Sequence, residues 1–244
     1  MKSKKILKYS LIGLAVLLGV AVVGFLAWTR LARYSAFPEA TALAQTAQTP
    51  QGWYVFQPPQ PTQTGLIFYP GGLVDPAAYA PLMKKLSDQG IMTVIVPMPL
   101  DLAIFGVNKA NDVIAAYPEI KQWIISGHSL GGSMAAEFVK SHPSAVAGIA
   151  FMAAYPADTT NLSTLPIKVV SVHGSNDGLA TEAKIQNSLK NLPVDTKVVT
   201  LEGGNHAQYG DYGPQAGDGA ATISREEQQK QTTTAILNLA HDLK

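Results

Sequence analysis

Short apolar runs alternate with stretches of helical spacing from residue 51 onwards, and this alternation constrains the fold more than any other feature. The apolar runs predict strands at 53–58, 65–70, 91–98, 121–126, 145–152, 167–172 and 197–201. The stretches with helical spacing predict helices at 75–90, 108–117, 133–142, 182–192 and 225–243. Continuously apolar strands interleaved with helices predict an α/β fold, in which a mostly parallel central sheet carries helices on both faces.

The predicted sheet also indicates where a functional site should lie. In open α/β sheets, ligands bind beyond the carboxyl ends of the strands. The candidate residues for chemistry are therefore those in loops that follow strands, not those in loops that precede them.

The alternation covers residues 51–244, which we expect to form one catalytic domain. No internal repeat or mid-chain low-complexity linker divides this stretch, and 47% hydrophobic residues suffice for a buried core. The preceding residues 31–50 are rich in Ala, Thr and Gln, so we expect a linker that leads into the domain.

An uncharged run of 18 residues, Leu11–Trp28, precedes the domain. As a helix it would extend about 27 Å, close to the thickness of the hydrocarbon core of a bilayer. We therefore expect residues 11–30 to form a transmembrane helix or signal anchor that meets the lipid bilayer. The lysines of the basic segment 1–10 place the N-terminus in the cytoplasm and the domain outside. The alternative is a cleaved signal peptide, which would leave a secreted protein, although "TRLARYSAF" offers only a poor cleavage site.

The composition excludes several functions. Only 14% of the residues are charged and the formal net charge is +1, which argues against a nucleic-acid partner. The chain has no cysteine, so disulfides, thiolate metal sites and a cysteine nucleophile are excluded. Asp211 and Asp218 lie among glycines but lack the spacing of an EF-hand, and we expect neither a metal nor a cofactor. The oligomeric state is left open.

The loop "GHSLGG" follows the predicted strand 121–126 and leads into a helix. This setting is typical of a nucleophile elbow, in which a serine is held on a sharp, strained turn. Ser129 is then the candidate nucleophile, and Gly127 and Gly131 remove side chains that would collide across the turn. The alternative is a glycine-rich packing turn without chemistry.

A serine nucleophile requires a base, and the base requires an orienting acid. Of the five histidines, His206 lies in the loop after the predicted strand 197–201, where the base is expected. The acid should follow the preceding strand, and Asp177 lies there, although "NDG" is also a plausible turn. Asp211 is the next candidate acid, followed by Asp218. The order Ser, Asp, His is that of α/β hydrolases.

The loop "YPGGLVD" follows the predicted strand 65–70 and is the candidate for one half of an oxyanion hole. An oxyanion needs two backbone N–H donors. One is expected from Leu130, the residue after the nucleophile, and the other from Gly72 or Leu73. The alternative is a flexible turn before a helix.

Together, "YPGG", "GHSLGG", "HGSNDG" and "GGNHAQYGDYGPQAGDGAATIS" resemble the α/β-hydrolase superfamily, in particular small bacterial membrane-attached hydrolases of the dienelactone-hydrolase-like branch with a serine nucleophile. The resemblance covers roughly residues 40–244 and implies the α/β-hydrolase fold. It assigns Ser129 as nucleophile, Asp177 as acid, His206 as base, and Gly72 and Leu130 as oxyanion hole. Two departures limit it: Pro70-Gly71 replaces the His-Gly of many relatives, and dienelactone hydrolases proper use cysteine. The dienelactone substrate is therefore not carried over.

The stretch between the predicted strands 145–152 and 167–172 has room for a loop but for no large lid. We therefore expect an open pocket for small or short-chain esters. Its walls are expected from Leu73, Tyr155, Leu179 and Tyr209, together with Leu130. The sequence thus predicts a membrane-tethered serine hydrolase that cleaves small carboxylic esters through an acyl-enzyme. The alternatives are an acyltransferase with the same triad and a non-catalytic cell-envelope binding protein.

Overall fold

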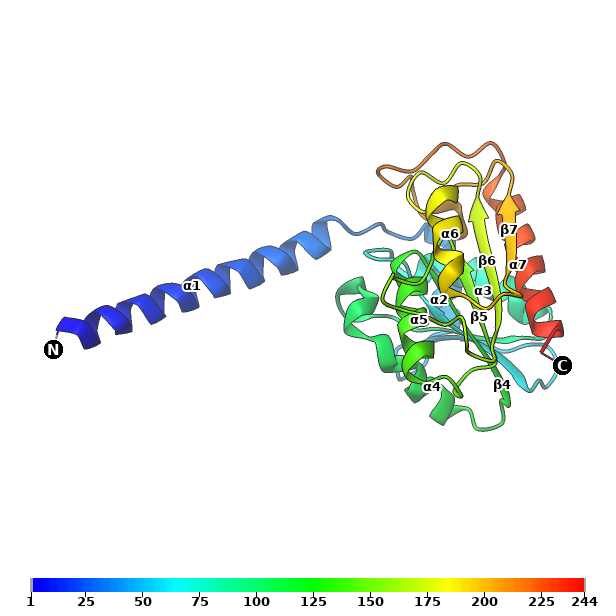
Figure 1. Ribbon diagram of the computed structural model, residues 1–244, viewed down its shortest axis with the longest axis horizontal. Coiled ribbons are helices and arrows are strands. Elements are labelled where there is room, and N and C mark those ends of the chain that lie inside the picture. Colours follow the sequence, from blue (N-terminus) through cyan, green and yellow to red (C-terminus); the bar gives the residue numbers. More distant parts are fainter. Residues whose placement is uncertain (1, 244) are drawn as a thin grey trace. The chain divides into compact units, whose positions relative to one another are not determined.

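A computed structural model describes residues 2–243, with side chains from Leu11 onwards. The chain divides into two compact units, Met1–Arg33 and Tyr34–Lys244. The first unit is the helix α1 (Lys2–Leu31), and the lysines of segment 1–10 lie outside the residues whose side chains are described. The second unit holds the whole sheet and the other helices (Figure 1).

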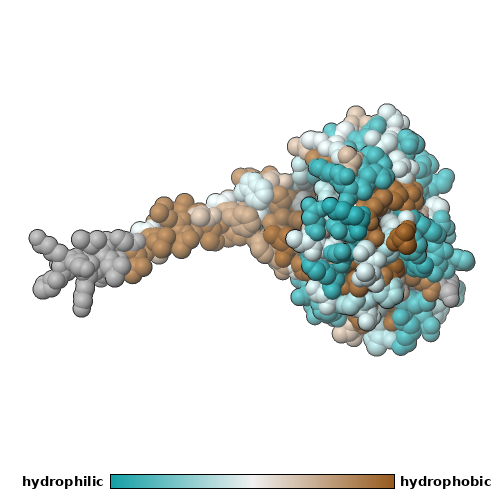
Figure 2. Space-filling model, in the orientation of Figure 1, coloured by the Kyte–Doolittle hydropathy of each residue, from teal (hydrophilic) through white to brown (hydrophobic). Residues whose placement is uncertain are grey.

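Helix α1 contains a stretch, Leu11–Leu31, that is long and apolar enough to cross a membrane. Its large apolar side chains are exposed, and Figure 2 shows them covering the visible face of the helix. Length and composition of this kind fit a membrane anchor and also a signal sequence.

Seven strands form one sheet in the second unit, in the order β1-β3-β2-β4-β5-β6-β7. Strand β1 is antiparallel to β3, and all other neighbouring pairs are parallel. The bounds are β1 (Tyr54–Phe56), β2 (Thr64–Tyr69), β3 (Met92–Ile95), β4 (Gln122–His128), β5 (Gly148–Met152), β6 (Lys168–Gly174) and β7 (Lys197–Leu201). The α/β class and the mostly parallel sheet predicted from the sequence are thereby confirmed.

The strand order places the site. The chain runs from β2 to one side of the sheet for β3 and then crosses back to the other side for β4. Ligands of open α/β sheets bind at such a switch point, beyond the carboxyl ends of the strands. The loops after β2 and β4 flank this point, and they are the loops that hold Gly72 and Ser129.

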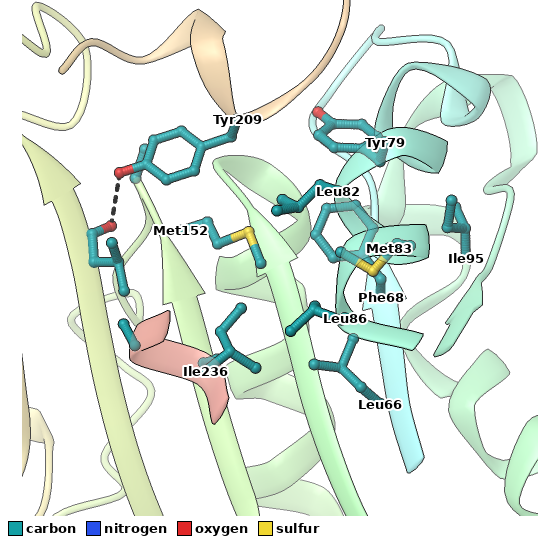
Figure 3. Close-up of a cluster of buried hydrophobic side chains, with 14 of the residues drawn as sticks. Leu66, Phe68, Tyr79, Leu82, Met83, Leu86, Ile95, Met152, Tyr209 and Ile236 are labelled. Carbon is teal, nitrogen blue, oxygen red and sulfur yellow. Dashed lines mark hydrogen bonds between the residues drawn. The ribbon is translucent and has the colours of Figure 1, made fainter. Parts of the chain in front are cut away.

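Helices cover both faces of the sheet (Figure 1). On one face, α3 and α7 pack over a core that includes Leu66, Leu86 and Ile236, part of which is drawn in Figure 3. On the other face, α4 and α5 pack over a second core. Alternate side chains of each strand enter alternate cores, as in Leu66 and Ile67 of β2. The bounds are α2 (Pro38–Thr46), α3 (Ala80–Asp88), α4 (Ala110–Ala116), α5 (Leu130–Ser141), α6 (Glu182–Ser188) and α7 (Arg225–His241).

Short 3-10 turns complete the fold: η1 (Pro76–Tyr79), η2 (Pro99–Asp101), η3 (Ala103–Phe105), η4 (Val107–Lys109), η5 (Leu189–Asn191) and η6 (Ala207–Tyr209). The helix expected over 75–90 is thus divided into η1 and α3. The strand expected over 91–98 ends at Ile95, and Pro97, which has no N–H for a sheet ladder, follows closely.

The stretch 31–50 differs from its expected role as a linker. Helix α2 occupies Pro38–Thr46, and its Ala40 and Ala44 are buried. Tyr34 forms an isolated bridge with Val74, so the folded unit begins at Tyr34 and not near residue 51.

Candidate active site

Ser129 lies on a strained turn between β4 and α5. Its backbone has φ 52° and ψ −122°, a conformation that non-glycine residues rarely adopt, and its N–H donates to the Met152 carbonyl at 3.0 Å. Both flanking glycines are required by space. A Cβ on Gly131 would lie 2.1 Å from the Tyr69 carbonyl oxygen, and one on Gly127 would lie 2.4 Å from the Gly131 backbone. The geometry is that of a nucleophile elbow.

Asp177 and His206 meet as a buried acid–base pair. The Nδ1–H of His206 donates to the two carboxylate oxygens of Asp177, at 2.9 and 3.1 Å. The Asp177 carboxylate also accepts the backbone N–H groups of Leu179 and Ala180, which fix its position in the loop after β6. The tautomer with a proton on Nδ1 leaves Nε2 as a free acceptor, as a general base requires.

The Nε2 atom of His206 is buried and has no hydrogen-bond partner among the described residues. A buried nitrogen without a partner is costly in a structure and is often found where a ligand or reacting group is received. The Ser129 hydroxyl is therefore not bonded to Nε2 in this state. Nucleophile–base contacts are commonly loose before substrate binds.

Backbone hydrogen bonds distinguish the two candidate oxyanion donors after β2. The Leu73 N–H donates to the Asp101 carbonyl at 2.8 Å, so it is already used. The Gly72 N–H has no acceptor within residues 2–243, and neither has that of Leu130, the first residue of α5. The two residues lie together, since a Cβ on Gly72 would be 3.1 Å from the Leu130 Cδ2. The geometry favours Gly72 and Leu130.

A buried hydrogen-bond chain, which the sequence did not indicate, links Gly71 in the loop after β2 to His206. Its order follows from the His206 carbonyl, which can only accept, so His128 donates to it from Nε2 at 3.0 Å. The Nδ1 of neutral His128 then accepts from the Tyr79 hydroxyl at 2.8 Å, and this hydroxyl accepts from the Gly71 N–H at 3.1 Å. In the sequence, the only indication that His128 has this bridging role is its position directly before Ser129.

The electrostatics of the buried chain favour its neutral form. Burial lowers the pKa of His128 well below its ordinary value, and the nearby His206 lowers it further. Burial likewise raises the pKa of the Tyr79 hydroxyl, which therefore stays protonated and available as a donor. Neutral His128 lies against His206, with ring centroids 4.6 Å apart and ring planes tilted by 49°.

Asp218 holds the acid loop and the base loop together. Its carboxylate accepts the backbone N–H groups of His206 at 3.0 Å, Ala207 at 2.9 Å and Gly178 at 3.3 Å. The sequence placed it only third among the candidate acids, but it contacts the backbone of His206, not the imidazole. Asp211, the second candidate, accepts instead from the Gln229 side chain at 2.6 Å.

The Gly/Asp-rich segment that carries Asp218 packs directly on the acid loop. A Cβ on Gly178 would lie 2.4 Å from the Gly217 carbonyl oxygen, and one on Gly219 would lie 2.0 Å from the Asn176 carbonyl oxygen. The glycines therefore allow two backbones to touch. This explains why a segment without helical or strand periodicity is rich in glycine.

The expected pocket walls divide into two groups. Leu73, Tyr155 and Leu179 are half-buried around the carboxyl edge of the sheet. Tyr209 does not line an open pocket: it is completely buried, and its hydroxyl donates to the Val172 carbonyl (Figure 3). Its ring packs on that of His128. Tyr209 therefore belongs to the core beneath His128 and not to the surface of the site. The segment 153–167, between β5 and β6, contains turns and no helix.

A strained turn after a central parallel strand, with an acid–base pair after two later strands, is the arrangement of α/β hydrolases. A model of the alpha/beta hydrolase family matches residues 65–230 of the chain. The chain belongs to the alpha/beta hydrolase family.

Similar solved structures share this fold at low sequence identity. Est1E from Butyrivibrio proteoclasticus has a TM-score of 0.60 and 12% identity, over 78% of this chain and 94% of its own. The esterase domain of a Rhodothermus marinus protein has a TM-score of 0.58 and 11% identity, over 79% and 95%. The monoacylglycerol lipase from Paleococcus ferrophilus has a TM-score of 0.58 and 12% identity, over 77% and 98%. No curated protein sequence matches the chain.

Proposed function

We propose that this protein is a serine hydrolase that cleaves small or short-chain carboxylic esters through an acyl-enzyme intermediate. The observation that carries the proposal is the buried Asp177–His206 pair, whose Nε2 has no partner, beside the strained turn of Ser129. The names of two structural neighbours, an esterase domain and a monoacylglycerol lipase, support ester bonds as the target.

In the proposed mechanism, His206 removes the proton of the Ser129 hydroxyl as its oxygen attacks the carbonyl carbon of the ester. The carbonyl oxygen becomes an anion and accepts the N–H groups of Gly72 and Leu130. The intermediate collapses to an acyl-enzyme while His206 returns the proton to the departing alcohol. A water molecule, deprotonated by His206, then attacks the acyl carbon, and His206 returns the proton to the Ser129 oxygen as the carboxylic acid departs. Asp177 keeps the imidazole in the required tautomer throughout.

The proposal of a small substrate rests on the segment that would cover the site. The segment 153–167 lies where lidded hydrolases insert helices, and here it forms only turns. Leu73, Tyr155 and Leu179 are the side chains that we expect around the acyl group. Higher activity on long-chain triglyceride emulsions than on soluble short-chain esters would contradict this part of the proposal.

We further propose that residues 11–30 tether the enzyme to the membrane, with the N-terminus inside and the catalytic domain outside the cytoplasm. The support is the apolar stretch Leu11–Leu31 and the lysines that precede it in the sequence. Cleavage of this segment would instead release a secreted enzyme, and the two cases are distinguished by the mass of the mature protein.

Covalent labelling tests the nucleophile. A fluorophosphonate probe should label the full-length protein and should fail to label Ser129→Ala, while His206→Ala should be labelled at least about 10³-fold more slowly. Ester hydrolysis should fall in parallel. An unlabelled, correctly folded wild-type protein would overturn the catalytic assignment and favour a non-catalytic binding protein. Product analysis with added alcohol acceptors separates hydrolysis from acyl transfer.

A further inference from the structure

The folded unit exposes few large apolar side chains, and most of them belong to one loop. Leu100 is 40% exposed, Ile104 48% and Phe105 50%, and all three lie in the loop that follows β3. Among the described residues from Tyr34 onwards, the other large exposed hydrophobic residue is Val194, before β7. Three exposed apolar side chains within six residues are unusual on a surface that contacts only water, and such clusters commonly mark an interaction surface.

This loop borders the candidate active site. The Asp101 carbonyl accepts the N–H of Leu73, the neighbour of the oxyanion donor Gly72. The Leu102 side chain also approaches the site, with its Cδ2 3.7 Å from a Cβ built on Gly72. Leu100, Ile104 and Phe105 flank Asp101 and Leu102 in the chain, and we call these three residues the apolar rim.

The backbone of the loop is held in an unfavourable conformation. Leu100 and Asp101 both have positive φ, 56° and 55°, which non-glycine residues adopt rarely and at a cost in free energy. Hydrogen bonds from the Asp101 N–H to the Met98 carbonyl and from the Leu102 N–H to the Pro99 carbonyl, both 3.0 Å, maintain it. Exposed Leu100 is thus presented to solvent by an ordered turn.

The chain enters the folded unit beside the loop after β2, to which Asp101 of the apolar-rim loop is hydrogen-bonded. The Tyr34 N–H donates to the Leu73 carbonyl at 2.8 Å, and the Tyr34 carbonyl accepts from the Asp75 N–H at 2.9 Å. The apolar helix ends at Leu31, three residues earlier. Three Cα–Cα steps span at most about 11 Å, whatever direction the helix takes. If this helix is inserted in a bilayer, its end cannot lie far from the oxyanion loop.

We propose that the apolar rim docks on the bilayer that holds residues 11–30, so that Ser129 receives small amphiphilic esters from the membrane interface. This inference rests on the membrane tether of the proposed function. The apolar rim would replace water contacts by contacts with lipid, and the short connection at residues 32–33 would keep it at the surface. The esters selected would be those that partition into the interface and present a short acyl group.

The absence of cysteine makes a direct test possible. The variants Phe105→Cys and Val194→Cys of the full-length protein are labelled with an environment-sensitive fluorophore and reconstituted into phosphatidylcholine vesicles. Val194 is the matched control, because it is fully exposed and apolar but precedes β7, at the amino edge of the sheet. We expect blue-shifted emission at position 105 and quenching there by nitroxide-labelled lipids, and neither effect at position 194. The same aqueous signal at both positions would overturn the docking proposal.

A kinetic measurement tests docking separately from catalysis. In the same vesicles, the double variant Ile104→Ser/Phe105→Ser should lower the ratio of the rate on a bilayer-resident short-chain ester to the rate on a soluble ester by about tenfold, whereas Val194→Ser should not. An unchanged ratio contradicts docking even when the fluorophosphonate probe labels Ser129. A lipid-embedded position 105 in a protein that the probe does not label would overturn the proposed function and leave docking intact.

Discussion

At the scale of single residues, the candidate site depends on carboxylates and imidazoles that bind backbone groups. Asp218 is the clearest case, since it accepts N–H groups from the loops of both the acid and the base. Among the described residues, the Asp218 carboxylate accepts only backbone N–H groups and is not hydrogen-bonded to the imidazole of His206 or the carboxylate of Asp177. We therefore regard it as a positioning residue that maintains the distance between the two loops.

Asp218→Asn should lower kcat by roughly 10- to 100-fold with little change in KM, because an amide accepts fewer hydrogen bonds and the imidazole loses its placement. Asp211→Asn is the matched control, because Asp211 lies in the same segment as Asp218 but its side chain accepts from Gln229 of α7. Steady-state kinetics on a soluble ester and thermal unfolding of both variants provide the measurement. A lower unfolding temperature with unchanged kcat would show that Asp218 has only a structural role.

Unlike the carboxylate of Asp218, the imidazole of His128 is neutral. It is buried and bridges Tyr79 and the His206 carbonyl by hydrogen bonds. Its pKa is held well below the ordinary value of 6.5 in the folded state. Above pH 6.5 the side chain is neutral in both states and contributes no pH dependence. Below pH 6.5 the unfolded chain binds a proton at this position that the folded chain does not, so stability falls as the pH falls.

The free energy of unfolding should therefore decrease by up to about 1.4 kcal/mol for each pH unit below 6.5 through this residue alone. His128→Gln keeps a donor toward the His206 carbonyl but does not titrate, so its pH slope should be smaller by that amount. Urea denaturation at pH 7.5 and 5.5 compares the two proteins. Equal slopes would mean that His128 is already protonated in the folded state at pH 5.5.

At the scale of elements, the alternation of apolar runs and helical stretches was sufficient to predict the seven strands and a mostly parallel sheet. Burial on both faces makes the inner strands β2 to β6 almost continuously apolar, and this signal is visible in a single sequence. Helix α2 gave no such signal, because its fully buried residues are the small Ala40 and Ala44, and its Leu43 is only partly buried against the core. Its composition resembles that of a linker.

The candidate site could be predicted in part for the same reason. Ser129, Asp177 and His206 each follow a strand, so their order in the chain is visible. Tyr79 and Asp218 act through hydrogen bonds to backbone groups of distant residues, and such bonds require no particular sequence at the partner. The buried position of Tyr209 could not be predicted either, because a tyrosine after a strand fits a pocket wall or a core equally well.

At the scale of the whole molecule, the boundary of the folded unit matters for its stability. A chain that starts at Tyr34 keeps α2 and should unfold at the same temperature as the full-length protein in detergent. A chain that starts at Gln51 loses α2, whose Ala44 belongs to the core, and should unfold about 5–10 °C lower. Circular dichroism on heating measures both. Equal unfolding temperatures would show that residues 34–50 are dispensable, as expected of a linker.

The hydrogen bonds around the proposed triad have a consequence for how its specificity can evolve. Asp218 and His128 both bind main-chain groups of His206, and Leu73 is held through its own N–H. None of these bonds depends on the half-buried side chains of Tyr155 and Leu179. Those two positions are free to accumulate substitutions while the catalytic framework persists. In the proposed esterase, selection can thus shift the acyl preference without rebuilding the chemistry, and directed libraries are best placed there.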